Sequence, residues 1–228
     1  MKGVLLLQLG TPDDPSTKAV RRYLGEFLFD PMVLDLPAIV RWVLLNLIIL
    51  PTRPARSAKA YRKIWTEQGS PLRIHSQDLA DALGQQLGQD YEVALGMRYG
   101  SGSILEALKH LEGAGVEEII ALPLYPQYAM SSTGTALAQL YRLASQQTIV
   151  PPLKVVPDFY DHPGFLDCVA KTIIEQRETF QPDHILFSYH GLPERHVRKT
   201  NPEENHDYTA DRCTEAIGKN NRSCYRAQ

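Results

Sequence analysis

The stretch MKGVLLLQLGTPDDP, residues 1–15, decides the fold class of this chain. One lysine precedes an apolar run, Val4 to Leu9, and the turn-forming residues Gly-Thr-Pro-Asp-Asp-Pro follow it. A short apolar run between turn signals is typical of a buried strand. The run is only about seven residues long and no small-residue cleavage site follows it, which argues against a signal peptide. We therefore expect the first strand of a sheet here.

Further apolar runs alternate with longer segments of helical period along the chain. The expected strands are Val4–Leu9, Glu92–Met97, Glu118–Leu124, Leu153–Val156 and His184–Tyr189. Between them, segments such as 16–28 and 103–115 have apolar residues three and four positions apart, which predicts helices. Alternating strands and helices predict a doubly wound α/β fold, in which helices cover both faces of a parallel sheet.

The pair Pro151 and Pro152 is the expected hinge between two α/β domains. The first, 1–150, holds three of the expected strands, and the second, 151–228, holds two. The 38 residues after His190 are polar and contain no further apolar run. A two-stranded parallel sheet would have bare edges, so we interpret the second domain as incomplete. A small domain closed by a terminal helix is the alternative.

Composition excludes several classes of function. Hydrophobic residues make up 43% of the chain and charged residues 22%, which is ordinary for a globular protein. The formal net charge of −2 creates no field that would attract nucleic acid, and no such partner is expected. The three cysteines, Cys168, Cys213 and Cys224, lack Cys-x-x-Cys spacing, which favours a reduced, cytoplasmic protein over a disulfide framework.

His190 is a candidate site residue because of its position. It ends the apolar run of HILFSYH, and Gly191 follows, where the backbone can turn and approach a ligand closely. Ligands of doubly wound sheets bind beyond the carboxyl ends of the strands. The alternative for a lone histidine is a buried ring bonded to a backbone carbonyl, but the place at a strand end favours a site.

Five motifs together resemble the ferrochelatase family, enzymes that insert ferrous iron into protoporphyrin. The motifs are LLQLGTPDDP at 6–15, GSPL at 69–72, GMRYG at 96–100, LPLYPQYAMSSTG at 122–134 and FSYHGLPER at 187–195. Each is weak alone, but their order along the chain is specific. The resemblance implies a two-domain chelatase fold. The family's remaining C-terminal part, including the carboxylate that faces the histidine across the porphyrin, has no counterpart here.

The resemblance implies that His190 is the catalytic group and the residue that meets the metal. Metallation removes two pyrrole protons while a divalent ion enters, and an imidazole that is neutral near pH 7 can accept a proton or meet the ion. Residue type does not decide between these two roles. The resemblance also implies that porphyrin contacts come from Arg53, Tyr61, Ser70, Arg98 and Tyr99. Arginine is suited to bind the propionates through two parallel hydrogen bonds.

The run Ser131, Ser132 and Thr133 precedes a segment of helical period, ALAQLYRL. Hydroxyls and free backbone N–H groups at a helix start can hold an anion, and Ser131 and Ser132 are included as substrate-binding candidates on that ground. Plain helix capping requires no ligand and is the favoured interpretation for at least two of the three.

The implied function is the last step of haem biosynthesis, insertion of ferrous iron into protoporphyrin by a lyase. Porphyrin and ferrous iron are substrates, no prosthetic group is expected, and no iron–sulfur cluster is expected on this chain. Since the family's partner carboxylate lies beyond position 228, the chain alone is expected to be inactive. The alternatives are a related chelatase for coproporphyrin or cobalt, and a non-enzymatic tetrapyrrole carrier.

The segment PMVLDLPAIVRWVLLNLIILP, residues 31–51, is called the lip here. Nine residues separate Arg41 from Pro51, fewer than the twenty or so that a membrane span needs. Two interpretations are level: an exposed apolar lip that touches the inner face of a membrane, which would make the protein peripheral, and a helix buried against the sheet.

The polar stretch NPEENHDYTADRC, residues 201–213, contains carboxylates, His206 and Cys213. Several of these residues are adjacent and cannot all face one ion, so the stretch is not expected to be a metal site.

Overall fold

The computed structural model describes residues 1–201 and 222–225, and its contacts group into two units. The first unit comprises 1–124 and 130–157, and the second comprises 125–129 and the chain from 158 onward. The sequence stretch 203–213, for which no metal site was expected, lies outside the described residues. The same holds for Cys213 and for most of the expected terminal helix.

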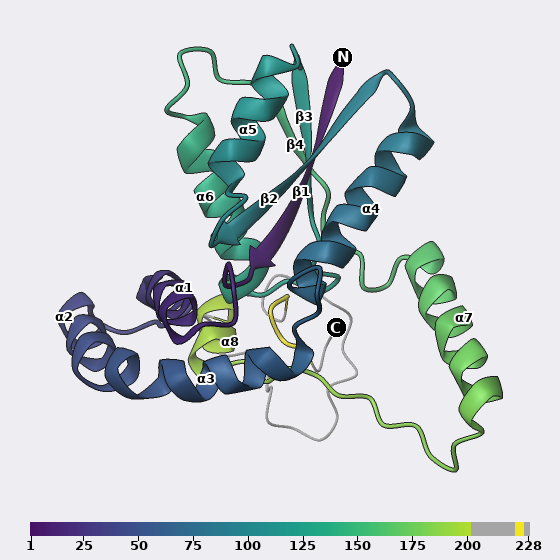
Figure 1. The fold of residues 1–228 in the computed structure, drawn as a ribbon. Coiled ribbons are helices and arrows are strands. Elements are labelled where there is room, and N and C mark those ends of the chain that lie inside the picture. Colours follow the sequence, from purple (N-terminus) through teal and green to yellow (C-terminus); the bar gives the residue numbers. More distant parts are fainter. Residues whose placement is uncertain (202–221, 226–228) are drawn as a thin grey trace. The chain divides into compact units, whose positions relative to one another are not determined.

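The first unit is built on a four-stranded parallel sheet (Figure 1). Its strands are β1 (Lys2–Gly10), β2 (Tyr91–Tyr99), β3 (Glu118–Pro123) and β4 (Leu153–Val155), in the order β2-β1-β3-β4. Leu6 of β1 aligns with Leu95 of β2 and with Leu122 of β3. The predicted α/β class with parallel strands is confirmed. The strand order reverses at β1 and β3, which is where doubly wound folds bind ligands.

The core forms on both faces of the central strand β1, in which Leu5, Leu6 and Leu7 are completely buried. A strand that is apolar on both faces can only be satisfied if helices cover both sides of the sheet. Helix α4 (Pro71–Leu87) covers one face, where Ala80 packs with Val4 and Leu6. Helices α5 (Ile104–Gly113) and α6 (Thr135–Ala144) cover the other face (Figure 1).

Helix α1 (Thr17–Phe29) begins directly after the loop that follows β1. The Ser16 hydroxyl accepts a hydrogen bond from the Ala19 amide at 3.2 Å and so caps the helix. The buried residues Val20, Tyr23 and Leu24 point to one side, as the three- and four-residue spacing predicts. Within the first unit, α1 lies beyond the carboxyl end of the sheet together with the helices that follow it (Figure 1).

The lip belongs to a helix that is longer than the sequence indicated. Helix α2 (Ala38–Val43), the π-helical segment η1 (Leu44–Ile49) and α3 (Leu50–Ile64) follow one another without a break. The helix continues past Pro51, so the nine residues counted between Arg41 and Pro51 do not give its length. Pro51 lies in the first turn of α3, directly after the change in hydrogen-bond pattern, where its missing N–H costs little. By length and composition alone, the helix Ala38–Ile64 could cross a membrane, although the core helix of a soluble protein meets the same criterion.

The sequence placed Leu153 at the start of a second sheet, and this expectation is wrong. Strand β4 pairs in parallel with β3 of the first sheet, with Leu153 opposite Ile119 and Val155 opposite Ala121. A short apolar run contains no information on which neighbour it will pair with, and the open edge of β3 provides one.

The expected strand His184–Tyr189 is also not formed in the described part of the chain. Residues 182–193 have no regular secondary structure there, and the Leu186 side chain is 92% exposed. A strand requires a hydrogen-bonded neighbour, and no described strand pairs with this run. On either side of it the second unit has helices α7 (Pro163–Phe180) and α8 (Glu194–Thr200).

Candidate active site

The first feature of the site is a close approach of two loops at the carboxyl ends of β1 and β2. Gly10 has a φ of +104°, and a Cβ placed on it would lie 1.9 Å from the backbone oxygen of Tyr99. Gly100 has a φ of +79°, and its Cβ would lie 2.5 Å from the oxygen of Thr11. Only glycine combines this left-handed backbone with such contacts. At this end of the sheet, the backbone of the loop after β1 therefore packs directly against the backbone at the end of β2.

The second feature is a buried cluster around Asp30, the residue directly after α1. Its Oδ2 atom accepts hydrogen bonds from the Arg98 guanidinium at 2.5 Å, the Tyr99 hydroxyl at 2.9 Å and the Thr135 hydroxyl at 2.5 Å. Its Oδ1 atom accepts one from the Met32 amide at 2.7 Å. Both oxygens of the carboxylate are thus satisfied inside the protein, as a buried charge requires.

The surroundings of Asp30 favour its ionised form. Burial alone would raise the pKa of this carboxyl, but the hydrogen bonds from Thr135, the Met32 amide and Tyr99, together with the charge of Arg98, hold the pKa below its usual value. Burial raises the pKa of the Tyr99 hydroxyl well above its usual value, so Tyr99 stays a neutral donor. The Arg98 guanidinium also lies over the Tyr99 ring, 4.4 Å from its centroid.

Arg98 and Tyr99, both predicted as porphyrin contacts, are brought together by this cluster. Arg98 donates from Nε to the Thr135 hydroxyl at 2.8 Å and from the guanidinium to Asp30, so its charge is already paired. Tyr99 is only 3% exposed. Their polar atoms are directed at protein groups in the first unit.

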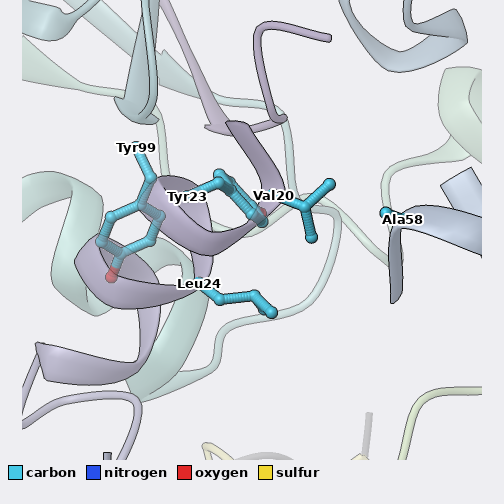
Figure 2. Close-up of a cluster of buried hydrophobic side chains, with 5 residues drawn as sticks. All are labelled: Val20, Tyr23, Leu24, Ala58 and Tyr99. Atoms are coloured by element: carbon cyan, nitrogen blue, oxygen red, sulfur yellow. The ribbon is translucent and has the colours of Figure 1, made fainter. Parts of the chain in front are cut away.

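Tyr61, another predicted contact, is half-buried in an aromatic cluster between α1 and α3. Its ring makes edge contacts with Tyr23 at 6.5 Å and with Trp65 at 6.2 Å between centroids. Figure 2 shows the buried part of this region. There Val20, Tyr23 and Leu24 of α1 lie between Tyr99 at the end of β2 and Ala58 of α3. Burial raises the pKa of the Tyr61 hydroxyl, while a hydrogen bond with Tyr23 opposes the rise. Tyr61 therefore presents a neutral, partly apolar face.

Ser70 lies at the start of α4 and is buried. Its hydroxyl oxygen accepts a hydrogen bond from the Thr11 hydroxyl at 2.9 Å, which joins the loop after β1 to the first turn of α4. A serine hydroxyl that accepts one bond can still donate its own proton. Thr11 was not singled out from the sequence, although it stands in the first motif.

Arg53, by contrast, is exposed. It lies on α3 beside a groove of about 550 Å³ that is lined by Ile48, Ile49, Thr52, Arg53, Arg56, Ser57 and Ala60. Within the described residues, neither Arg53 nor Arg56 forms an ion pair. The groove thus combines an apolar wall with two available cations.

Ser131 and Ser132 lie inside a helical turn, not in front of one. The π-helical segment η2 (Met130–Gly134) runs directly into α6, and both serines are half-buried within it. The sequence placed all three hydroxyl residues before the helix, because the helical period is first evident in ALAQLYRL. Neither serine has the position of a side-chain cap for α6.

His190 belongs to the second unit, where it is exposed at the end of the segment 184–190. Gly191, Leu192 and Pro193 connect it to α8, whose first residue is Glu194. The imidazole is accessible to solvent, so it can exchange protons and meet a metal ion. The alternative of a buried structural histidine does not apply to the described chain.

Comparison with known proteins gives the family. The family model described as ferrochelatase matches residues 1–228. The chain belongs to the ferrochelatase family. It is 48% identical over 226 residues to the ferrochelatase of Coxiella burnetii strain RSA 493, covering 99% of the chain and 62% of that relative. It is 44% identical over 228 residues to the ferrochelatase of Legionella pneumophila strain Paris, covering all of the chain and 66% of that relative.

The chain therefore spans a little under two thirds of the length of these ferrochelatases. The family motif GMRYG contains Arg98 and Tyr99, which the sequence identified, but their partner Asp30 was missed. Asp30 follows a predicted helix and precedes Pro31, where a charged residue usually faces solvent. The available signal was a lone carboxylate at the junction of two apolar segments, FLF and the lip. Thr135 gave no signal at all.

Proposed function

We propose that this protein inserts ferrous iron into protoporphyrin to give protohaem, with His190 as the group that accepts a pyrrole proton or meets the iron. The observation that carries the proposal is membership of the ferrochelatase family over the whole chain, with His190 inside the matched range. The exposed imidazole of His190 supports it, because a proton acceptor or metal ligand for this reaction must be accessible.

The porphyrin contacts that we propose are Arg53, Tyr61 and Ser70, and Ser131 and Ser132 remain further candidates. Arg53 is exposed and carries an available charge for a propionate. Tyr61 offers a half-buried aromatic face, and the Ser70 hydroxyl retains a proton to donate. A flat apolar macrocycle with two carboxylates suits a surface that is aromatic at one end and cationic at the other.

A metal-insertion assay on the full-length protein tests the activity. Protoporphyrin and coproporphyrin are supplied in parallel with ferrous iron under anaerobic conditions, and the absorption bands of the product are followed. We expect insertion with protoporphyrin, its loss in His190→Ala by about 10²-fold or more, and retained porphyrin binding in that variant. His184→Ala, in the same exposed segment, is the matched control.

Each other outcome of this assay points to a different function. Insertion into coproporphyrin alone, or of cobalt but not iron, would indicate a related chelatase. Binding without insertion by the wild-type protein would indicate a carrier. Normal insertion by His190→Ala would show that another residue is the catalytic group.

The 228-residue chain alone is proposed to bind porphyrin weakly and to insert iron at a negligible rate. His190 has a neighbouring carboxylate in Glu194, but that side chain belongs to α8 and lies 3.9 Å from Arg198. A histidine that acts as a base needs an oriented partner to fix its tautomer. The same assay on the isolated chain measures this, and insertion at the rate of the full-length protein would contradict it.

We also propose that the lip contacts a membrane surface, from which an apolar porphyrin can be collected. Its exposed side chains include Ile39 at 80%, Leu47 at 64% and Trp42 at 52%. These values favour the exposed interpretation over a helix buried against the sheet. The two arginines that line the groove next to the lip, Arg53 and Arg56, are suited to lipid phosphates.

Vesicle flotation tests the membrane contact. We expect the protein to float with vesicles that contain anionic lipid, and the double variant Ile39→Ser, Leu47→Ser to remain at the bottom of the gradient. The double variant Leu79→Ser, Leu105→Ser removes two exposed apolar residues, although less exposed ones, from α4 and α5 and is the control. Flotation unaffected by the lip substitutions would show that the lip is not the contact.

A further inference from the structure

Asp30 joins three parts of the first unit that are distant in the sequence. It follows the last residue of α1 and precedes the lip, Arg98 and Tyr99 end β2, and Thr135 begins α6. Its partners are 68, 69 and 105 residues away along the chain. One carboxylate oxygen of Asp30 receives all three hydrogen bonds. A shift of α1, of β2 or of α6 relative to the other two would therefore break at least one of these bonds.

The cluster consists of one negative and one positive charge. The Asp30 side chain is 6% exposed and that of Arg98 is 18% exposed, so both are largely removed from water. A buried carboxylate without its cation is strongly unfavourable, and so is a buried guanidinium without its carboxylate. Arg98 already uses Nε on Thr135 and Nη2 on Asp30, so it could grip a porphyrin propionate through two parallel bonds only by leaving Asp30, and Asp30 has no second described cation within ion-pair distance.

The position of Asp30 also fixes where the lip starts. Its Oδ1 atom accepts from the Met32 amide, and its backbone oxygen accepts from the Val33 and Leu34 amides at 3.1 and 2.9 Å. The backbone of Asp30 therefore forms the first turn of the lip, and its side chain holds that turn against the end of β2.

We propose that Asp30 is a positioning residue that holds the base of the lip against the carboxyl end of the sheet, and that Arg98 acts through Asp30 and does not bind substrate carboxylate. The part of this inference that concerns substrate rests on the proposed function. Arg53, whose charge is available, is the anchor for a propionate, while Arg98 is the cation that keeps Asp30 in place.

The decisive measurement compares the affinity of the full-length protein for protoporphyrin and for its dimethyl ester. The ester has the same ring but no carboxylates. We expect Arg53→Met to weaken binding of protoporphyrin by about tenfold more than binding of the ester, as loss of a charge-assisted hydrogen bond implies. We expect Arg98→Met to weaken both ligands by the same factor. A selective loss of protoporphyrin in Arg98→Met would overturn the assignment of Arg98.

A double-mutant cycle on Asp30→Asn and Arg98→Met tests the pair without any ligand. Each single variant leaves one buried charge without its partner, so the double variant should be more stable than the sum of the two losses predicts. Asp30→Asn should also be cleaved faster than wild type within 31–37 in limited proteolysis. Additive losses with unchanged cleavage would overturn the positioning role. If a single variant does not fold, a double variant that is no more stable than that single variant would overturn it as well.

The two experiments separate this inference from the proposed function. If the wild-type protein binds neither protoporphyrin nor the ester, the proposed function fails, and the cycle and the proteolysis still decide the role of Asp30. If porphyrin binds but the Asp30–Arg98 coupling is absent, the proposed function stands and the inference fails.

Discussion

Strand β3 and the segment 184–189 are similar in sequence and opposite in environment. EIIALP and HILFSY are both short apolar runs that lead to a turn, but Ile119 is 3% exposed in β3, whereas Phe187 is 66% and Leu186 92% exposed in the other run. Strand β3 has a neighbour on each side, and no described strand pairs with 184–189. An apolar run therefore predicts which residues require burial. Whether they are buried as a strand depends on a neighbouring strand that the run itself does not specify.

Truncating a leucine in each environment tests this contrast with the largest expected effect. Leu6 in β1 is completely buried between two strands, and Leu6→Ala should lower the free energy of unfolding by about 2–5 kcal/mol. Leu186→Ala in the 228-residue chain should change it by less than about 0.5 kcal/mol. Urea denaturation of both variants measures the difference. A costly Leu186→Ala would show that the segment is packed in solution.

Two glycines sharpen the same comparison at the level of the backbone. Gly10→Ala places a Cβ against the Tyr99 oxygen at a φ of +104°, which should cost about 1–3 kcal/mol or more. Gly191→Ala, beside His190, meets no described atom within 4 Å, and we expect little change or a slight gain. Thermal unfolding of the two variants checks this. Equal losses would mean that the region around Gly191 is as constrained as the sheet.

Lowering the pH should reduce the contribution of the buried Asp30 carboxylate to the free energy of unfolding more than that of an exposed carboxylate. The pKa of Asp30 is lower in the folded protein than in the unfolded chain, so its contribution to stability is present above the unfolded pKa, about 3.9, and is lost as the pH falls through the folded value. Asp30→Asn should be less stable than wild type at pH 7, by about 3 kcal/mol, and the gap should narrow below pH 4. Urea midpoints at several pH values measure the gap. Asp183→Asn, which replaces an exposed residue, is the control, and a constant gap for Asp30→Asn would contradict the prediction.

The smallest expected effects concern the starts of two helices. Ser103 caps α5 in a capping box with Glu106, so Ser103→Ala should cost about 1 kcal/mol. His162 at the start of α7 makes no described side-chain cap bond, and His162→Ser should gain a few tenths of a kcal/mol. Circular dichroism during thermal unfolding compares the two. A loss in His162→Ser would show that the histidine has a role at this position.

The sequence predicted the first three strands because each is a short apolar run followed by turn-forming residues or a segment of helical period. It failed for the sheet to which β4 belongs, since three residues, of which Lys154 is exposed, do not specify a neighbour. It underestimated the length of the lip helix, because the count of apolar residues stopped at Pro51, whereas a proline is tolerated in the turn that follows the π-helical segment. These failures concern neighbours and context, which a single run of residues does not contain.

For the candidate site, the sequence located residues but not their partners. Arg98 and Tyr99 were found through the motif GMRYG, and Arg53, Tyr61 and Ser70 through the family resemblance. The bond between Arg98 and Asp30 joins positions 68 residues apart, and no spacing rule reaches that far. Whether a charge is available to a ligand or already paired was therefore visible only in the structure.

The π-helical segment Leu44–Ile49 sets the rotational phase of everything after it. The i→i+5 bonds of this segment place more residues in a turn than the i→i+4 bonds of an α-helix do, so α3 would start at a different rotation relative to α2 if the same six residues were α-helical. Ala58 and Tyr61 would then face away from α1, although almost nothing in the composition had changed. A change in the length of the lip would therefore need a second change that restores this phase, whereas a substitution at an exposed lip position such as Ile39 leaves the phase unaltered.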